Sequence, residues 1–132
     1  MKNKICLLLF CLWALFIFSN SWTPATQSDV ISGGLSYKLY TLLNLQMDYF
    51  TFHVFVRKAA HFIEFFILGL LSIGSFKNMK FSLFICILVA CCDETIQLFT
   101  EGRSGQISDV MLDSFGSSCS FILLKIKEKL KW

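Results

Sequence analysis

Apolar residues in this chain form four long runs that are separated by short polar segments. The runs are Ile5–Phe18, Ala59–Phe76, Phe81–Phe99 and Ile107–Ile126. The last three approach the roughly 20 residues that an α-helix needs to cross a hydrocarbon core of about 30 Å. We expect the first to extend over about 5–22, to an interfacial tryptophan. The pattern predicts an all-α protein, a small polytopic bundle of four transmembrane helices.

The first run has two interpretations. It follows Lys2 and Lys4 and precedes Ser19-Asn20-Ser21, as would the core of a signal peptide before a small-residue cleavage region. We favour a retained span, because Trp13 and several other bulky residues lie close to the outer end of the run. Asn20 would also make a poor cleavage site.

The long segment between the first and second spans, residues 23–56, predicts an amphipathic helix. Thr23-Pro24 and Gly33-Gly34 are expected to mark breaks. Residues 35–55 then mix apolar side chains with sparse charges, as a helix lying in the membrane interface would. Because residues 50–56 are also apolar, the second span could begin earlier than Ala59.

Composition agrees with a membrane protein. The 132 residues are 55% hydrophobic, with fifteen phenylalanines, and the mean hydropathy is +0.64. Such a chain is too apolar for one small soluble domain. A single proline, with no flexible linker and no repeat, predicts that residues 1–132 form one membrane domain.

Positive charges predict the orientation of the spans. With both termini in the cytoplasm, eight positive residues face the cytoplasm and four face outward, in agreement with the positive-inside rule. The inner eight are Lys2, Lys4, Lys77, Lys80, Lys125, Lys127, Lys129 and Lys131; the outer four are Lys38, Arg57, Lys58 and Arg103. The net charge of +3 is thus explained by lysines near lipid headgroups, and we expect no nucleic-acid partner.

The six cysteines all lie inside apolar runs. They show neither a CxxC pattern nor zinc-type spacing with histidine. We therefore interpret them as small buried residues rather than as a redox or metal centre.

Polar residues inside the predicted spans are the main functional indication. An ionisable group in hydrocarbon costs about 2.5 kcal/mol or more, so such residues mark candidate sites. Residues three or four apart share one face of a helix, and each set here has that spacing. The sets are His61 with Glu64, Asp93 and Glu94 with Gln97, and Asp109 with Asp113. All fall at a similar, outer depth of the membrane.

Short connections should bring these faces together. Residues 100–106 join the third and fourth spans, so the two helices must be antiparallel neighbours. Gly116 and Ser120 offer a small-residue face for close helix packing. Gly102 and Gly105 flank Arg103 and would let its loop adopt positive φ, aiming an anion-binding guanidinium at the pocket. Five carboxylates so close together cannot all stay ionised without cations.

Two segments of the chain resemble a known family. RKAAHFIEFFILGLL (57–71) and DETIQLFTEGRSGQISDVMLDSFG (93–116) are similar to the VanZ-like membrane proteins of bacteria. The family pattern combines a K-x-x-H-x-x-E segment, a D-E-x-x-Q segment and a G-R loop before a D-x-x-x-[DN] helix. Its signature positions here are Lys58, His61, Glu64, Asp93, Glu94, Gln97, Arg103, Asp109 and Asp113.

The chain departs from the family pattern at two positions. Ile96 stands where many relatives carry histidine, and Glu101 stands where many carry proline. A mechanism that needs a second imidazole is therefore disfavoured. His61 would be the only nitrogen ligand among carboxylates, so we expect no metal and no cofactor.

The resemblance implies a role in the bacterial cell envelope, and the family takes its name from a protein that lowers teicoplanin susceptibility. Our first hypothesis is an outward-facing site for an anionic envelope lipid or lipid-linked precursor, in which Lys58 and Arg103 hold a phosphate. His61 and Glu94 would be the acid/base pair if chemistry occurs. The candidate catalytic residues are His61, Glu64, Asp93 and Glu94; the candidate ligand-binding residues are Lys58, Gln97, Arg103, Asp109 and Asp113.

The second hypothesis is a non-enzymatic scaffold in which buried charges only fix helix packing. Arg57 or Lys58 would then pair with Glu64, and Arg103 with Glu101 or Asp109. A proton or ion pathway is less favoured, because the inner halves of the spans hold few polar side chains beyond Ser72, Ser75 and Ser82. The sequence identifies neither a reaction nor an oligomeric state.

Overall fold

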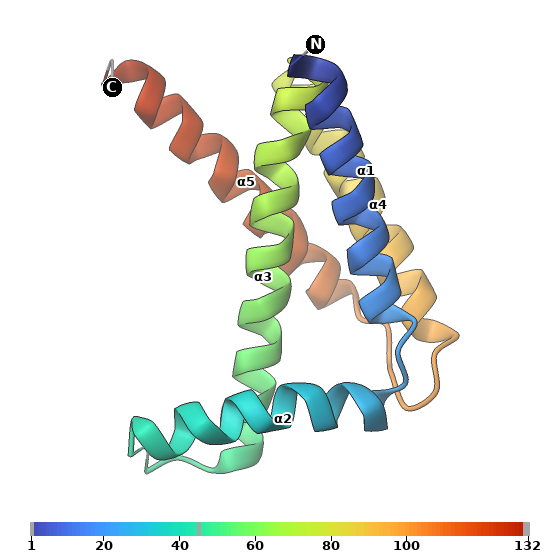
Figure 1. Cartoon of the computed structure of the whole chain (residues 1–132), viewed down its shortest axis with the longest axis vertical. Coiled ribbons are helices and arrows are strands. Elements are labelled where there is room, and N and C mark those ends of the chain that lie inside the picture. The colour runs from blue at the N-terminus through green and yellow to red at the C-terminus, as the bar shows by residue number, and fades with distance from the viewer. Residues whose placement is uncertain (1, 45, 131–132) are drawn as a thin grey trace.

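The computed structural model describes residues 2–44 and 46–130, and in these ranges it contains five α-helices and no strand (Figure 1). The predicted all-α fold is confirmed. Leu45 of the predicted amphipathic segment and Lys131 of the predicted cytoplasmic tail lie outside the described residues. The helices are α1 (Lys2–Ser21), α2 (Ala25–Leu42), α3 (Tyr49–Phe76), α4 (Met79–Leu98) and α5 (Ile107–Lys129).

Four of these helices, α1, α3, α4 and α5, are long and apolar enough to cross a membrane. They correspond to the four predicted spans. The second span is longer than the apolar run starting at Ala59, because α3 begins at Tyr49. Its start is fixed by Asp48, whose carboxylate accepts a hydrogen bond from the Thr51 amide at 3.0 Å.

The segment before α3 differs from the prediction. Thr23-Pro24 does separate two helices, but Gly33-Gly34 lies inside α2 and does not break it. Residues 35–55 are also not one helix, because α2 ends at Leu42 and the chain turns at Asn44, where φ is +46°. α2 is continuous through both glycines. At this point α2 contacts α3, because the Tyr49 hydroxyl donates a hydrogen bond to the Gly33 carbonyl at 3.2 Å.

α2 lies across one end of the other helices, nearly perpendicular to α3 (Figure 1). We call this the α2 end. The start of α1 and the end of α5 are both at the opposite end, where α5 diverges from the bundle (Figure 1).

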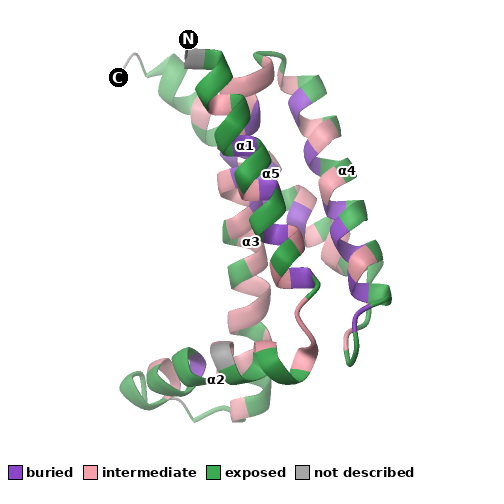
Figure 2. Ribbon diagram, turned by 45° about the vertical axis from the view of Figure 1, so that its right-hand side comes forward, coloured by how far each residue is buried: buried purple, intermediate pink, exposed green. Residues whose placement is uncertain are grey.

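The core is small and lies between the inner faces of the helices (Figure 2). α3 is central and packs against α1, α4 and α5. Small residues allow its close approach to α5: a Cβ on Gly116 would lie 2.6 Å from the Phe62 carbonyl oxygen. The predicted small-residue face on the last span is therefore real, and its partner is α3. The buried apolar residues include Phe10, Ile17, Phe65, Leu68, Cys86, Ala90 and Phe121.

Candidate functional site

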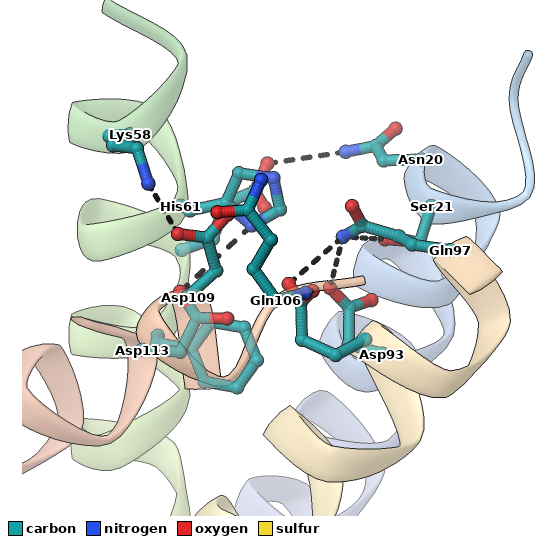
Figure 3. A network of polar contacts seen from close by, with 12 residues as sticks. Asn20, Ser21, Lys58, His61, Asp93, Gln97, Gln106, Asp109 and Asp113 are labelled. Carbon is teal, nitrogen blue, oxygen red and sulfur yellow. Dashed lines mark hydrogen bonds and ion pairs between the residues drawn. The ribbon is translucent and has the colours of Figure 1, made fainter. Parts of the chain in front are cut away.

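Polar side chains from α1, α3, α4 and α5 converge in one place (Figure 3). Asp93 and Asp113 are fully buried, and Glu94 and Gln97 are each only 5% exposed. His61 and Glu64 face this cluster from α3. The helix faces that the sequence marked as polar thus meet in one place.

The side-chain amide of Gln97 contacts three other polar side chains. Its Nε2 lies 3.1 Å from Asp93 Oδ2, 3.3 Å from Glu94 Oε1 and 3.3 Å from Ser21 Oγ. These contacts join two acids of α4 to the last residue of α1. The amide donor groups therefore partly offset two neighbouring negative charges.

Glu94 also holds the beginning of α5. Its Oε2 accepts a hydrogen bond from the Gln106 amide at 2.8 Å, at the N-terminal end of that helix. A carboxylate is favourable there because the helix dipole is positive at its N-terminus. Gly105 permits this approach, since a Cβ on it would lie 2.4 Å from the Glu94 carbonyl oxygen.

Arg103 fastens the loop between α4 and α5 to the end of α1. Its Nε donates to the Thr23 carbonyl at 2.9 Å, and its Nη2 donates to the Asn20 carbonyl at 3.0 Å. Gly102 has the positive φ expected of this loop, +73°. The predicted alternative, in which Arg103 pairs with Glu101 or Asp109, is wrong: Nε and Nη2 are directed to backbone carbonyls, and no such ion pair occurs among the described residues.

Burial lowers the pKa of the Arg103 guanidinium from its ordinary value, and the nearby charge of Arg57 adds to this effect. The ordinary value is so high that the group stays charged. Arg57 and Arg103, which come from different segments, border the same two pockets.

The remaining charged residues pair differently from the simplest expectation. Glu64 Oε1 accepts a hydrogen bond from Asn20 Nδ2 at 3.2 Å and does not pair with Arg57 or Lys58. Arg57 instead lies 3.5 Å from Asp29 of α2. Lys58 forms an ion pair with Asp109 that joins α3 to α5.

His61, Asp93 and Asp113 form a separate group that takes part in none of these pairs. His61 Nδ1 and Asp113 Oδ1 are 3.9 Å apart. Among the described residues, His61 Nδ1, Asp93 Oδ1 and both carboxylate oxygens of Asp113 have no hydrogen-bond partner. Buried polar atoms are normally satisfied, so this group requires an explanation.

Two adjacent pockets open beside the cluster, and Arg57, His61 and Arg103 border both. The larger, of about 300 Å³, lies between the end of α1, α2 and α3, and its wall includes Leu35 and Val56. The smaller, of about 190 Å³, also borders Lys58, Gln97, Gln106 and Asp109.

Sequence reasoning missed the contribution of α1 to this cluster. Asn20, Ser21 and Thr23 supply a side-chain amide, a hydroxyl and carbonyl groups, and Thr100 Oγ1 bonds the Ser21 carbonyl at 3.0 Å. Their polar character at the end of the first apolar run was the available indication. Asn20 and Ser21 were considered only as part of a disfavoured cleavage region, and not as partners of the polar helix faces.

Four membrane-crossing helices around a buried polar cluster define a multi-pass integral membrane protein, embedded in a lipid bilayer. A family model described as VanZ/LLP1 matches residues 5–128, nearly the whole chain. The protein therefore belongs to the VanZ-like family, as its motifs indicated. No curated protein and no solved structure matches the chain.

Proposed function

We propose that this VanZ-like protein binds the phosphate-bearing headgroup of an anionic envelope lipid, or of a lipid-linked envelope precursor, at the α2 end. The observation that carries the proposal is the pocket of about 300 Å³ bordered by Arg57, His61 and Arg103. Ligand pockets commonly combine apolar walls with a few converging polar groups, and volumes near this one hold small ligands.

The pocket has the chemistry of an amphiphile site. Arg57 and Arg103 provide guanidinium groups, which suit phosphate oxygens. Leu35, Val56 and Ala60 provide an apolar wall for the first part of a lipid chain. A free phosphate would use the cations without the wall, whereas a lipid would use both.

Lys58 borders the smaller pocket, where it is already paired with Asp109. Both oxygens of Glu94 already accept hydrogen bonds, from Gln97 and from Gln106. Glu94 is therefore a weaker candidate for a general base than His61. The proposal is one of binding and assigns no reaction.

The proposed location is the bacterial plasma membrane, with both termini in the cytoplasm and residues 1–132 acting as one membrane domain. Support comes from charge: the end opposite α2 carries Lys4, Lys77, Lys80 and the lysines near the end of α5. In this orientation the polar site opens on the outer face, where envelope precursors are used.

The binding test uses the full chain purified into nanodiscs and a radiolabelled polyprenyl phosphate. We expect saturable binding to the wild type, weakened about tenfold by Arg57→Gln and also by Arg103→Gln, which is a loss of about 1.4 kcal/mol each. Unlabelled polyprenyl phosphate should compete, and inorganic phosphate should compete poorly if the apolar wall contributes.

Lys38→Gln is the matched control. Lys38 is exposed on α2 and borders neither pocket. Its replacement by glutamine removes one positive charge from the α2 end, as the arginine substitutions do. Equal loss of binding in this control would indicate general attraction to the membrane surface. Unchanged binding when Arg57, Lys58 and Arg103 are all replaced would overturn the proposal.

Lowered susceptibility to teicoplanin is the envelope effect that we propose for such binding. Expression in a sensitive Gram-positive host should raise the inhibitory concentration of teicoplanin, and Arg57→Gln should lose the effect at unchanged protein abundance. No difference between the wild type and an empty vector would remove this part of the proposal only.

One set of contacts favours the alternative, a scaffold held together by its polar residues. Arg103, Glu64 and Glu94 all bond to neighbouring elements and so fasten the loop, α1 and α5. For a scaffold, replacing His61 or Asp109 should reduce abundance and activity in parallel, since unpaired buried charges destabilise the bundle. Activity lost at full abundance would favour the binding site.

A further inference from the structure

Three ionisable side chains from three helices meet inside the bundle with unused ligand atoms. His61 comes from α3, Asp93 from α4 and Asp113 from α5 (Figure 3). One ligand atom from each lies within 4.8 Å of the corresponding atoms of the other two. Both aspartates are fully buried, and within the described residues three of their four oxygens have no hydrogen-bond partner.

The nearest basic side chains do not satisfy these acids. Lys58 is paired with Asp109, and Arg103 donates to the carbonyls of Thr23 and Asn20. Two carboxylates buried together without a cation repel each other and lose their hydration. A group that carries two positive charges would neutralise both.

We propose that His61, Asp93 and Asp113 bind one divalent transition-metal cation, of the kind represented by Mn²⁺ and Zn²⁺. Carboxylate oxygen suits Mn²⁺ and imidazole nitrogen suits Zn²⁺, so the mixed set favours these ions over Mg²⁺ or Ca²⁺. The proposal departs from the sequence-based expectation of no metal. The earlier expectation rested on the small number of nitrogen ligands. The sequence could not show that carboxylate oxygens of Asp93 and Asp113 lack hydrogen-bond partners in the described part of the chain.

All three ligand atoms lie within 4.8 Å of one another, so an ion must draw the side chains together by rotation. Ligand atoms about 2.1 Å from a tetrahedral ion lie about 3.4 Å apart. The separation between His61 Nδ1 and Asp113 Oδ1 is 3.9 Å, so the two side chains must approach each other by only about 0.5 Å.

Neighbouring residues prepare the site in the way that metal sites require. Gln97 holds Asp93 by Oδ2 at 3.1 Å and leaves Oδ1 for the ion. Three protein ligands leave at least one coordination position open. Of the three ligands, His61 borders both pockets, whereas Asp93 and Asp113 border neither. Metal binding itself does not depend on the lipid proposal.

The test measures metal binding by the purified, metal-stripped full chain in nanodiscs. Equilibrium dialysis against Mn²⁺, Zn²⁺ and Mg²⁺ in turn, followed by elemental analysis, should show one saturable site for Mn²⁺ or Zn²⁺ and much weaker binding of Mg²⁺. Asp113→Asn and His61→Gln should each weaken binding at least about tenfold.

Asp29→Asn is the matched control, because it makes the same acid-to-amide change as Asp113→Asn, and Asp29 of α2 pairs with Arg57 and lies outside the triad and both pockets. It should bind metal like the wild type. Circular dichroism reports whether each variant keeps its helices. If a variant does not fold, the test is made on the folded wild type with bound Mn²⁺. Pulsed electron paramagnetic resonance should then detect a nitrogen of the His61 imidazole bound to the ion.

Several results would overturn the proposal. They are no saturable binding of either ion, binding unchanged in folded Asp113→Asn, or a Mn²⁺ spectrum without nitrogen coupling. A further contrary result is an infrared band of a protonated aspartic acid that persists in excess metal and is absent from Asp113→Asn. It would show that protonation, and not a cation, removes the repulsion between the two carboxylates. The lipid-binding assay would be unaffected by failure here.

Discussion

His61 on α3 and Asp113 on α5 face each other at 3.9 Å because the two helices touch one turn away. Phe62, the residue after His61, contacts Gly116, the residue three after Asp113, through its backbone carbonyl. Only a residue without a side chain permits this approach. A small-residue contact therefore sets the distance between an imidazole and a buried carboxylate.

Gly116→Ala should destabilise the bundle. The added Cβ would lie 2.6 Å from the Phe62 carbonyl oxygen, so the backbones of α3 and α5 must separate. Overpacking of this kind costs about 1–3 kcal/mol. The loss should appear as a lower free energy of unfolding in a steric-trapping assay.

Gly34→Ala is the control for that substitution. Nothing lies within 4 Å of a Cβ at this position in α2, and alanine is the better helix former by up to about 1 kcal/mol. We expect unchanged or slightly higher stability. A Gly116→Ala protein as stable as Gly34→Ala would mean that the close contact does not set the helix spacing.

The spans and the polar faces could be predicted from sequence because hydrophobic length and three- or four-residue spacing are local properties. Glu64, Asp93 and Asp109 were placed on common helical faces on that basis. Short connections then limited how far apart α4 and α5 could lie.

The partners of these residues could not be predicted, because they depend on how helices rotate and tilt. Arg103 had two acids nearby in sequence, yet its donors reach the carbonyls of Asn20 and Thr23. Likewise, Gly33-Gly34 looked like a break, but contact with Tyr49 of α3 accompanies a continuous helix there. Tertiary contacts override local propensity in both cases.

Gln97→Leu should reduce stability without changing the shape of the site greatly. It removes the amide that lies beside Asp93, Glu94 and Ser21, leaving buried acceptors unsatisfied. Each unsatisfied buried group costs about 1–3 kcal/mol. Folded abundance in the membrane and the free energy of unfolding should both fall.

Gln106→Leu serves as the comparison, since that side chain is exposed and its bond to Glu94 is made by the backbone amide. Its stability should stay near that of the wild type. Similar losses for both glutamines would show that the Gln97 amide has no special role.

Lys58 and Asp109 should be energetically coupled. Their side chains are 44% and 24% exposed, so the ion pair is partly screened and worth about 1 kcal/mol or less. A double-mutant cycle with Lys58→Met and Asp109→Asn measures this coupling through the free energies of unfolding. Additive effects of the two substitutions would show that the pair does not hold α3 to α5.

Arg103→Lys should loosen the loop between α4 and α5 while keeping its charge. An ammonium group cannot reproduce the two directed bonds from Nε and Nη2 to separate carbonyls. Hydrogen exchange of the amides of residues 100–106 should become faster. Glu101→Gln, at an exposed neighbouring position, should leave the exchange rates unchanged; equally fast exchange in that variant would contradict the proposed role of Arg103.

The most direct test of the central claim, that the α2 end is a binding site for an anionic lipid, is photolabelling of the full chain in native membranes with a photoreactive polyprenyl phosphate. We predict that labelled peptides identified by mass spectrometry contain Leu35, Val56 or Ala60, which border the larger pocket. Excess unlabelled polyprenyl phosphate should prevent this labelling. Labelling concentrated on the exposed face of α5 around Ile122 and Leu123, or spread evenly over all lipid-facing helices, would contradict the claim.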